Sequence, residues 1–430
     1  MQIEMRPVST ITPYENNPRH NDEGVEAVAA SLNEFGWRQP IVVDEAGVIV
    51  VGHTRYKAAL QLGMTEVPVH VATGLTPAQV RAYRIADNQT ATLTSWDDDK
   101  LTAELMELQK QGYDLDHTGF SDDRIQEILH DGVEQPGDPD AVPEPPDEAI
   151  TQPGDLILLG NHRLLCGDSS KPEDVDRLLA GATIQLVNTD PPYNVRVEPR
   201  SNNAIAAGLS SFESTNHQKL DVARHPAKAQ ATHTKLRAKD RPLVNDFVTE
   251  QEFDRLLDAW FGNLARVLDP GRSFYVWGGY ANLGNYPAPL QRHGLYFSQA
   301  VVWDKQHPVL TRKDMMGAFE LAFYGWKEGR AHQFFGPNNA TDLWAIKKVT
   351  PQSMIHLTEK PVELAARAIE YSSQFNENVL DLFGGSGSTL IACEQLGRNA
   401  YLMELDPLYC DVIVQRWEQF TGKKATRSAA

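Results

Sequence analysis

The sequence predicts an α/β protein in which a doubly wound sheet follows a smaller α+β domain. From residue 151 onwards, short apolar runs alternate with amphipathic helical segments, an order that produces parallel strands with helices on both faces. Residues 132–148 hold five prolines, six acidic residues and no basic residue, which indicates an extended linker. We therefore expect a small domain with a helical extension over 1–131, an acidic, proline-rich linker over 132–150, and the sheet over 151–425.

The charge of the chain is distributed unevenly. The 430 residues carry a net charge of −18, yet residues 1–150 alone hold 10 Lys and Arg against 27 Asp and Glu. Residues 195–241 reverse the sign, with nine basic and four acidic side chains. A basic loop on a nearly neutral domain can bind phosphates. The negative charge of the whole chain therefore does not exclude nucleic acid as a partner.

Neither a membrane nor a secretory pathway is indicated. The sequence has no apolar run of transmembrane length, and its first residues lack the pattern of a signal peptide. The cysteines Cys166, Cys393 and Cys410 have no metal-binding spacing and are typical of small buried residues. We expect a cytoplasmic protein with no metal site and no membrane partner.

A glycine stands at a strand-to-helix junction of the first domain. Gly52 follows a strand and opens a helix, where exposed backbone N–H groups can hold an anion. Arg55 lies one turn into that helix and either joins such a cradle or pairs with one of the many local acids. The expected elements are strands at 40–43, 48–51 and 67–71 and helices at 53–62, 77–86, 100–111 and 122–130.

Several motifs of this domain resemble the N-terminal domain of the ParB family. They are Asn17-Pro18-Arg19, residues 35–41, residues 51–59 and Asp87-Asn88-Gln89. The resemblance covers about residues 1–95 and implies a nucleotide-binding site that would use Gly52, His53, Arg55 and Asn88. Thr54 and Thr90 stand where that family usually has arginines, a departure that bears on nucleotide hydrolysis.

The hexapeptide Thr189–Asn194 carries the most chemistry in the second domain. Its two consecutive prolines fix the backbone and remove two N–H donors, so the carboxylate of Asp190 and nearby carbonyls remain as rigid acceptors. Tyr193 follows directly. Acceptors beside an aromatic ring suit a flat base with an exocyclic amine, which reaches such a pocket only when flipped out of a duplex or taken from a single strand. The alternative is a proline-stiffened turn after a core strand.

A glycine-rich turn lies far downstream, at residues 384–387. Gly385 and Gly387 give G-x-G, but Leu390 occupies the place of the third glycine of a dinucleotide fingerprint. The turn therefore indicates a different cofactor that carries a carboxylate or phosphates, or else a plain strand-to-helix connection. Glu404 ends the next strand, 23 residues after Asp381, where an acid is placed to accept ribose hydroxyls.

The remaining elements follow from the same patterns. Residues 195–245, 304–316 and 327–348 have no regular pattern and are expected to be irregular. The expected strands are 155–159, 162–166, 184–188, 273–278, 296–303, 319–326, 379–383 and 400–403, and the expected helices are 171–180, 252–268, 362–372, 388–396 and 407–420.

An Asp-Pro-Pro-Tyr motif upstream of Phe-x-Gly-x-Gly resembles the β group of DNA amino-methyltransferases, which methylate exocyclic amines with S-adenosylmethionine. The resemblance covers about residues 152–421 and implies a Rossmann-like S-adenosylmethionine-dependent methyltransferase sheet. It assigns the target amine to Asp190 and the Pro191 carbonyl, with Pro192 in the same motif, and base stacking to Tyr193. The cofactor-binding residues it implies are Asp168, Thr358, Lys360, Asp381, Phe383, Gly385, Ser386, Gly387, Ser388 and Glu404.

The expected function is methylation of adenine N6 in double-stranded DNA, and the resemblance allows a homodimer. Two alternatives remain open at this point. One is cytosine-N4 methylation, although N4 enzymes more often have Ser where Asp190 stands. The other is a ParB-like DNA-binding or partition protein with an inactive methyltransferase fold. The basic loop is expected to contact DNA through Arg196, Arg200, Arg237, Lys239 and Arg241.

Overall fold

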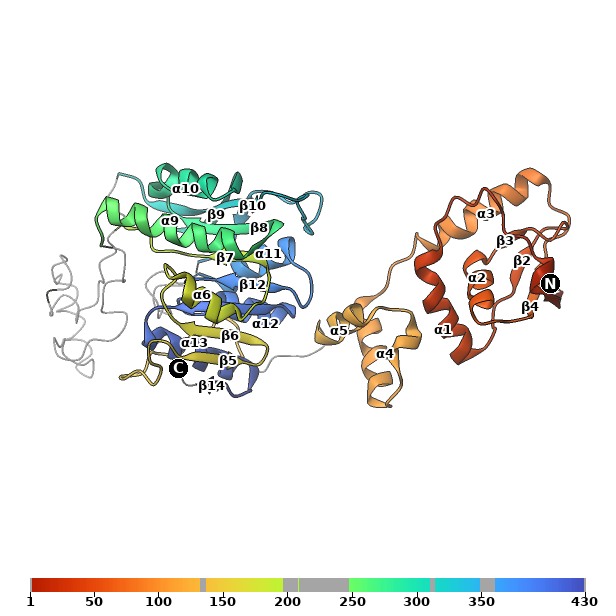
Figure 1. Ribbon diagram of the computed structural model, residues 1–430, viewed down its shortest axis with the longest axis horizontal. Helices are drawn as coiled ribbons and strands as arrows, with labels where there is room; N and C mark the ends of the chain where they lie inside the picture. The colour runs from red at the N-terminus through yellow and green to blue at the C-terminus, as the bar shows by residue number, and fades with distance from the viewer. Residues whose placement is uncertain are drawn as a thin grey trace. The chain divides into compact units, whose positions relative to one another are not determined.

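The computed structural model describes residues 2–131, 137–195, 208, 247–309, 314–348 and 360–428. The chain divides into two compact units, Met1–Val133 and Glu134–Ala430, drawn in Figure 1. Within the described ranges, every helix is too short or too polar to cross a membrane. All three cysteines are free and buried, as the sequence predicts.

The first unit is built on a four-stranded sheet with the order β1-β4-β2-β3. Its strands are β1 (Ile3–Pro7), β2 (Ile41–Val43), β3 (Ile49–Val51) and β4 (Glu66–Val71), and its first three helices are α1 (Val25–Phe35), α2 (His53–Gln61) and α3 (Pro77–Ala91). Alternating apolar residues of β2 to β4 are fully buried and form the core. The sequence analysis missed β1 and α1, although Val25, Val28, Ala29 and Leu32 follow helical spacing.

Two further helices complete this unit, α4 (Asp98–Lys110) and α5 (Asp122–Asp131). The carboxylate of Asp97 accepts a hydrogen bond from the Lys100 backbone N–H at 3.3 Å and caps α4. The helices pack on each other through a small apolar cluster. This helical segment lies where the extension was predicted.

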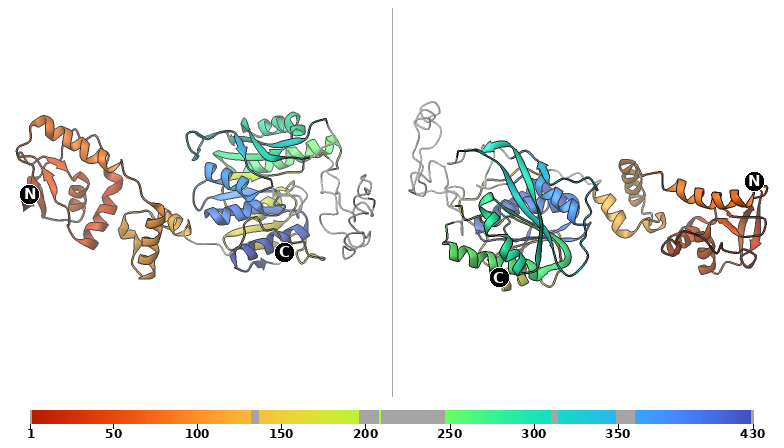
Figure 2. Two further views of the ribbon diagram at one scale, coloured as in Figure 1. Left: turned by 180° about the vertical axis from the view of Figure 1, so that it is seen from behind. Right: turned by 90° about the horizontal axis from the view of Figure 1, so that it is seen from above.

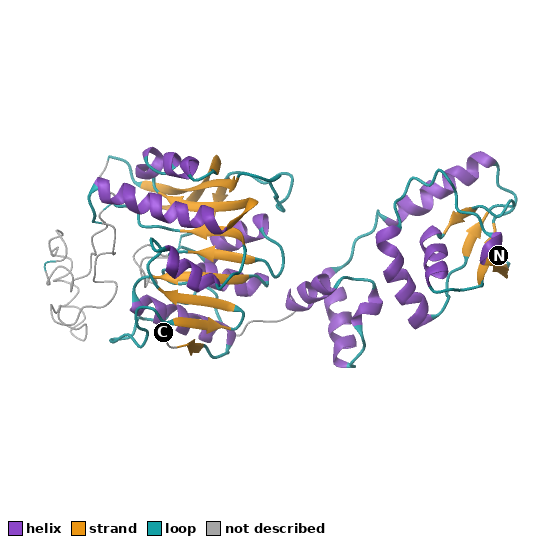
Figure 3. Ribbon diagram, viewed as in Figure 1, coloured by secondary structure: helices purple, strands orange, loops and turns teal. Residues whose placement is uncertain are grey.

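The second unit contains a ten-stranded sheet with the order β11-β9-β10-β8-β7-β12-β13-β6-β5-β14 (Figure 3). Its centre, from β8 to β6, is parallel, and β10 pairs antiparallel with both β8 and β9. The strands are β5 (Leu156–Leu159), β6 (His162–Cys166), β7 (Ile184–Thr189), β8 (Leu268–Gly278), β9 (Leu295–Val309), β10 (Gly317–Lys327), β11 (Leu343–Ala345), β12 (Asn378–Asp381), β13 (Asn399–Glu404) and β14 (Thr426–Ser428).

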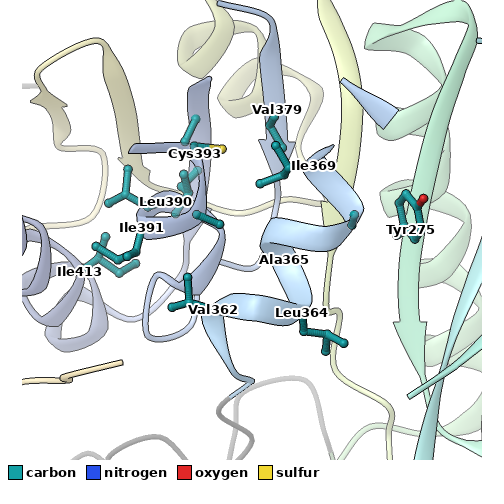
Figure 4. Close-up of a cluster of buried hydrophobic side chains, with 14 of the residues drawn as sticks. Tyr275, Val362, Leu364, Ala365, Ile369, Val379, Leu390, Ile391, Cys393 and Ile413 are labelled. Atoms are coloured by element: carbon teal, nitrogen blue, oxygen red, sulfur yellow. The ribbon is translucent and has the colours of Figure 1, made fainter. Parts of the chain in front are cut away.

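Helices cover both faces of this sheet, as a doubly wound fold requires (Figure 2). One face packs against α6 (Pro172–Leu179), α9 (Glu250–Val267) and α10 (Pro287–Arg292). The other packs against α11 (Val362–Ser372), α12 (Ser388–Leu396) and α13 (Pro407–Thr421). Figure 4 shows apolar side chains of α11 and α12 meeting in this second core. The predicted doubly wound α/β class is therefore correct.

Two stretches expected to be irregular are strands. Strand β9 continues to Val309, because Asp304 and Val309 pair with Phe319 and Gly317 of β10 across a register shift. Residues 304–309 are mostly polar and so lack the apolar pattern of a strand. Their strand conformation depends on pairing with β10. Residues 343–345 likewise form β11 by pairing with β9.

Residues 137–150 belong to the second unit and contact its helices. The guanidinium of Arg416 on α13 donates a hydrogen bond to the Pro139 carbonyl at 2.8 Å. The carboxylate of Asp140 accepts from the Val362 backbone N–H, at the start of α11, at 3.2 Å. The Ile150 N–H donates to Asp411 on α13 at 2.6 Å. This stretch of the predicted linker is thus hydrogen-bonded to α11 and α13 at several points.

Candidate active site

The carboxyl ends of the central parallel strands bring the predicted site residues to one edge of the sheet. Asp168 follows β6, Asp190 follows β7, the glycine turn follows β12, and Glu404 ends β13. Helix α9, the first helix described after β7, packs on one face of the sheet, and α12, which follows β12, packs on the other. Ligands of open α/β sheets bind at such a switch point, which here lies between Asp190 and the glycine turn.

The carboxylate of Asp190 is held by two donors of the site. Its Oδ1 accepts from the Tyr193 hydroxyl at 2.7 Å, and its Oδ2 accepts from Nζ of Lys360. Lys360 Nζ also donates to the Tyr193 oxygen at 3.1 Å and lies 5.5 Å from the centroid of that ring. Lys360, expected at the cofactor, is therefore a member of the Asp-Pro-Pro-Tyr cluster.

Glu320 and Lys305 complete this cluster, and neither residue was predicted to belong to it. Glu320 is on β10, and its Oε2 lies 3.3 Å from the Tyr193 hydroxyl and 3.4 Å from Nζ of Lys360. Its Oε1 accepts from Nζ of Lys305 on β9 at 2.5 Å. Because β10 runs antiparallel to β8, its first residues lie at the carboxyl edge of the sheet. The one signal for Glu320 in the sequence is that an acid occupies the second position of the predicted strand 319–326.

The ionic cluster fixes the charge of its members. Burial raises the pKa of Asp190, and Lys360 only partly opposes this. Burial also acts to raise the pKa of Glu320, but Lys360 and Lys305 outweigh it and lower that pKa to about 2. Burial acts to lower the pKa of Lys360, but Asp190 and Glu320 outweigh it and raise that pKa. Lys360 is thus a cation and Glu320 an anion at neutral pH.

Two asparagines hold the backbone around Tyr193. Asn282, fully buried, accepts from the Gly279 N–H at 3.0 Å and donates to the Tyr193 carbonyl at 3.4 Å. The side-chain amide of Asn194 exchanges two hydrogen bonds, each 3.2 Å, with the backbone of Val248. These contacts fix the segment that carries the aromatic ring.

The glycine turn packs closely on its neighbours. Gly384 donates to the Met403 carbonyl at 2.8 Å, and a Cβ at Gly384 would lie 3.0 Å from Ile413. Gly387 opens α12 with a φ of 86°, the left-handed region that favours glycine. The turn therefore brings backbone without side chains to the switch point.

Glu404 is anchored to that turn. Its Oε2 accepts from the Gly385 N–H at 2.8 Å, and its Oε1 accepts from the Asp406 N–H at 2.9 Å. Burial raises the pKa of Glu404 to about 7. Each carboxylate oxygen can accept more than one hydrogen bond, so Glu404 keeps the capacity to accept hydroxyl groups.

Three of the predicted cofactor residues are held in place by contacts with neighbouring side chains. The carboxylate of Asp381 accepts from the hydroxyls of Thr189 at 2.9 Å and Thr389 at 2.7 Å, and burial raises its pKa to about 7. The Phe383 ring packs edge-on against Trp260, with 4.9 Å between centroids. The buried Ser386 accepts from Arg416 through its carbonyl at 2.9 Å. Ser388 is the first residue of α12.

Asp168 lies in a loop that is hydrogen-bonded to the end of β12. Its Oδ1 accepts from the backbone and hydroxyl of Ser170, at 3.0 and 2.7 Å. The hydroxyl of Ser169 donates to the Leu382 carbonyl at 2.5 Å, which links the loop to the residue after β12. The close-packed glycine turn and the acid at the end of β13 fit S-adenosylmethionine, which has a ribose with two hydroxyls and a methionine end.

Other predicted site residues fall outside the described residues. These are Thr358 and the basic residues Arg196, Arg200, Arg237, Lys239 and Arg241. In the part of the chain that the structure describes, no three His, Cys, Asp or Glu side chains are grouped as a metal site.

The first unit brings its predicted residues to the start of α2. Gly52 caps α2 with a φ of 102°, and a Cβ there would lie 3.4 Å from the Arg55 guanidinium. His53 Nε2 accepts from the Tyr14 N–H at 3.3 Å, and burial lowers the pKa of this imidazole. Asn88, on α3, accepts from Arg19 at 2.8 Å.

Known protein families match residues in both units. The DNA methylase family matches residues 184–415, the ParB N-terminal domain matches residues 1–89, and the ParB-methyltransferase HTH domain matches residues 99–153. The sequence analysis described this last segment only as a helical extension followed by a linker.

Individual relatives resemble separate parts of the chain. The ParB-like nuclease domain-containing protein YnaK of Escherichia coli is 42% identical over 80 residues, which are 18% of this chain and 92% of that protein. The type II methyltransferase M.HinfI of Haemophilus influenzae is 27% identical over 191 residues, 40% of this chain and 52% of its own length. The chain thus spans about half of M.HinfI. The M1.HpyAVI–SAM complex is 19% identical, with a TM-score of 0.39, over 59% of this chain and 98% of that one.

Proposed function

We propose that this chain, which belongs to the DNA methylase family, methylates the N6 amine of a flipped adenine in double-stranded DNA. As a member of that family it is a DNA methyltransferase, and its cofactor is S-adenosylmethionine. The observation that carries the proposal is the position of Asp190, Pro191 and Tyr193 across the switch point from the Gly385–Gly387 turn and Glu404. Acceptors for an amine and a cradle for a methyl donor meet there.

Each side chain has a defined task in this proposal. The carboxylate of Asp190 and the Pro191 carbonyl accept the N–H groups of the target amine and direct its lone pair. Tyr193 stacks on the base, and Pro192 keeps the motif rigid. When bound, the cofactor supplies an electrophilic methyl group on its sulfonium. The rate enhancement comes from alignment and from acceptors that stabilise the charge developing on nitrogen, and Asp190 Oδ is placed to take the released proton.

The residues of the glycine turn would hold the cofactor. Gly385 and Gly387 would permit close approach of the backbone, Glu404 would accept the ribose hydroxyls, and Asp168 would contact the adenine ring. Thr358 would hold the methionine end, whereas Lys360, expected there from the sequence, pairs with Asp190 and Glu320. Phe383, Asp381 and Ser386 would shape this surface, as their contacts support, and Ser388 would join them from the start of α12.

Nucleoside mass spectrometry tests the reaction directly. Unmethylated DNA is incubated with the protein and with cofactor labelled on its methyl group, then digested to nucleosides. Labelled N6-methyladenine is the expected product. Labelled N4-methylcytosine would contradict the adenine assignment, and no label would favour a DNA-binding protein with an inactive methyltransferase fold.

Double-stranded DNA and a homodimer are proposed as its partners, and the cytoplasm as its compartment. The proposed phosphate contacts are Arg196, Arg200, Arg237, Lys239 and Arg241. Binding that depends on such cations weakens as the salt concentration rises. Alanine at two of these positions should reduce the slope of binding against salt concentration by about 2. Light scattering at several concentrations tests the homodimer.

We also propose that the first unit binds a nucleotide at the start of α2. The support is the Gly52 cap beside the Arg55 guanidinium, with His53 and Asn88 nearby, a helix N-terminus that suits phosphate. Filter binding with each of the four labelled ribonucleoside triphosphates measures this. Arg55→Ala should abolish binding, and Arg81→Ala, at an exposed position of α3, should leave it intact.

A further inference from the structure

The carboxylate of Asp190 already accepts hydrogen bonds at both oxygens. Tyr193 donates to Oδ1 at 2.7 Å and Lys360 donates to Oδ2. In the proposed reaction the same carboxylate must accept the N–H of the target amine. The amine must therefore share or displace these donors, and a displaced ammonium group that is only 9% exposed needs another anion nearby.

Glu320 is the anion in the right place. Its Oε2 is 3.3 Å from the Tyr193 hydroxyl and 3.4 Å from Nζ of Lys360, the same two donors that contact Asp190. Strand β10, which carries Glu320, is held between β8 and β9, and Lys305 binds Oε1 at 2.5 Å. Glu320 is thus a fixed, ionised acceptor beside the reacting carboxylate.

We propose that Glu320 is a positioning residue for methyl transfer, which receives Lys360 and the Tyr193 hydroxyl when the target amine engages Asp190. This inference rests on the proposed function. The transfer requires only a small movement, because both donors are already within 3.4 Å of Glu320. Lys360 stays paired with a carboxylate throughout, so no buried charge is left alone.

The surroundings of both carboxylates define how pH should act. Asp190 is faced by Lys360 from the segment before α11, by Glu320 from β10, by Tyr193 from its own motif and by Asp381 from β12. Lys305 from β9 and Lys348, just beyond β11, face Glu320. Removal of the Glu320 charge takes away a repulsive anion and leaves Lys360 to Asp190 alone, so the pKa of Asp190 should fall.

Glu320→Gln tests the inference in single-turnover methylation with saturating cofactor and DNA. The rate constant should fall roughly 10- to 100-fold, the cost of a misplaced reacting group, with DNA and cofactor affinities within about threefold of wild type. The acidic limb of the pH–rate profile should move to lower pH, a shift that simple loss of folding would not cause. Glu328→Gln, an exposed position just beyond β10, is the matched control and should change neither.

A second variant separates positioning from stability. Glu320→Gln leaves Lys305 without its carboxylate, so the double variant Lys305→Met/Glu320→Gln removes that buried cation as well. The inference predicts that this variant recovers its melting temperature and remains slow. Wild-type rates in Glu320→Gln, or recovery of activity in the double variant, would overturn it. A wild-type chain that forms no N6-methyladenine would overturn the proposed function and this inference with it.

Discussion

The two units use the same backbone conformation with different side chains beside it. In each, a glycine with left-handed φ caps a helix directly after a strand: Gly52, with φ 102°, opens α2, and Gly387, with φ 86°, opens α12. Beside the first glycine lie the Arg55 guanidinium and the apolar Ile41. Buried acids surround the second turn, where Glu404 accepts from Gly385.

The difference shows that the neighbours of a glycine turn decide its ligand. A helix N-terminus with an arginine beside it favours an anion such as phosphate. A turn beside Asp381 and Glu404 presents carboxyl oxygens, which suit hydroxyl donors. The glycines alone would not separate these two cases.

Glu404→Ala should produce the largest change in cofactor binding. Hydrogen bonds to a charged acceptor contribute about 1.5–3 kcal/mol each, so affinity for S-adenosylmethionine should fall about 100-fold by calorimetry. Arg55→Ala, in the junction of the first unit, should leave that affinity unchanged. Equal effects of the two variants would contradict the division of ligands between the junctions.

Gly387→Ala should have a smaller effect on the same measurement. Alanine in left-handed conformation costs about 1–2 kcal/mol, and its Cβ would lie 3.3 Å from Ile413. Cofactor affinity should fall about tenfold, together with the melting temperature. Gly52→Ala strains the first junction in the same way and should leave cofactor affinity at the wild-type value; a loss there would break the comparison.

Lowering the pH should change the contributions of Glu404 and His53 to stability in opposite directions. These are the smallest of the predicted effects. The folded pKa of Glu404 is about 7, raised above its ordinary 4.5, so its contribution to stability is present below pH 4.5 and is lost as pH rises through 7. Burial lowers the pKa of His53 below 6.5, so its contribution is lost as pH falls below 6.5. Melting temperatures of wild type, Glu404→Gln and His53→Gln are measured from pH 4.5 to 8. As the pH changes, the difference between Glu404→Gln and wild type should change in the opposite direction to the difference between His53→Gln and wild type.

Contiguous motifs and strand–helix alternation were predictable from the sequence. Asp190 and Tyr193 lie in one hexapeptide, and the Gly385–Gly387 turn lies between a clear strand and a clear helix. Those local patterns place them at the carboxyl ends of β7 and β12, and the DNA methylase match confirms the methyltransferase assignment.

Contacts made by distant segments were not predictable in this way. Glu320 reaches Tyr193 only because β10 pairs antiparallel with β8, and Lys305 reaches Glu320 only because β9 continues into a polar stretch. Asn282 supports the Tyr193 carbonyl from 89 residues away. Sequence periodicity carries no signal for such pairings, which depend on strand order.

The central claim is that Asp190 holds the target amine while the glycine turn holds the methyl donor. Single-turnover methylation by Asp190→Ala, with cofactor affinity measured on the same preparation, tests it most directly, with Asp254→Ala on the exposed side of α9 as the control. We predict that methyl transfer falls on the order of 10²–10³-fold while cofactor affinity stays within about threefold. Full activity of Asp190→Ala would contradict the account.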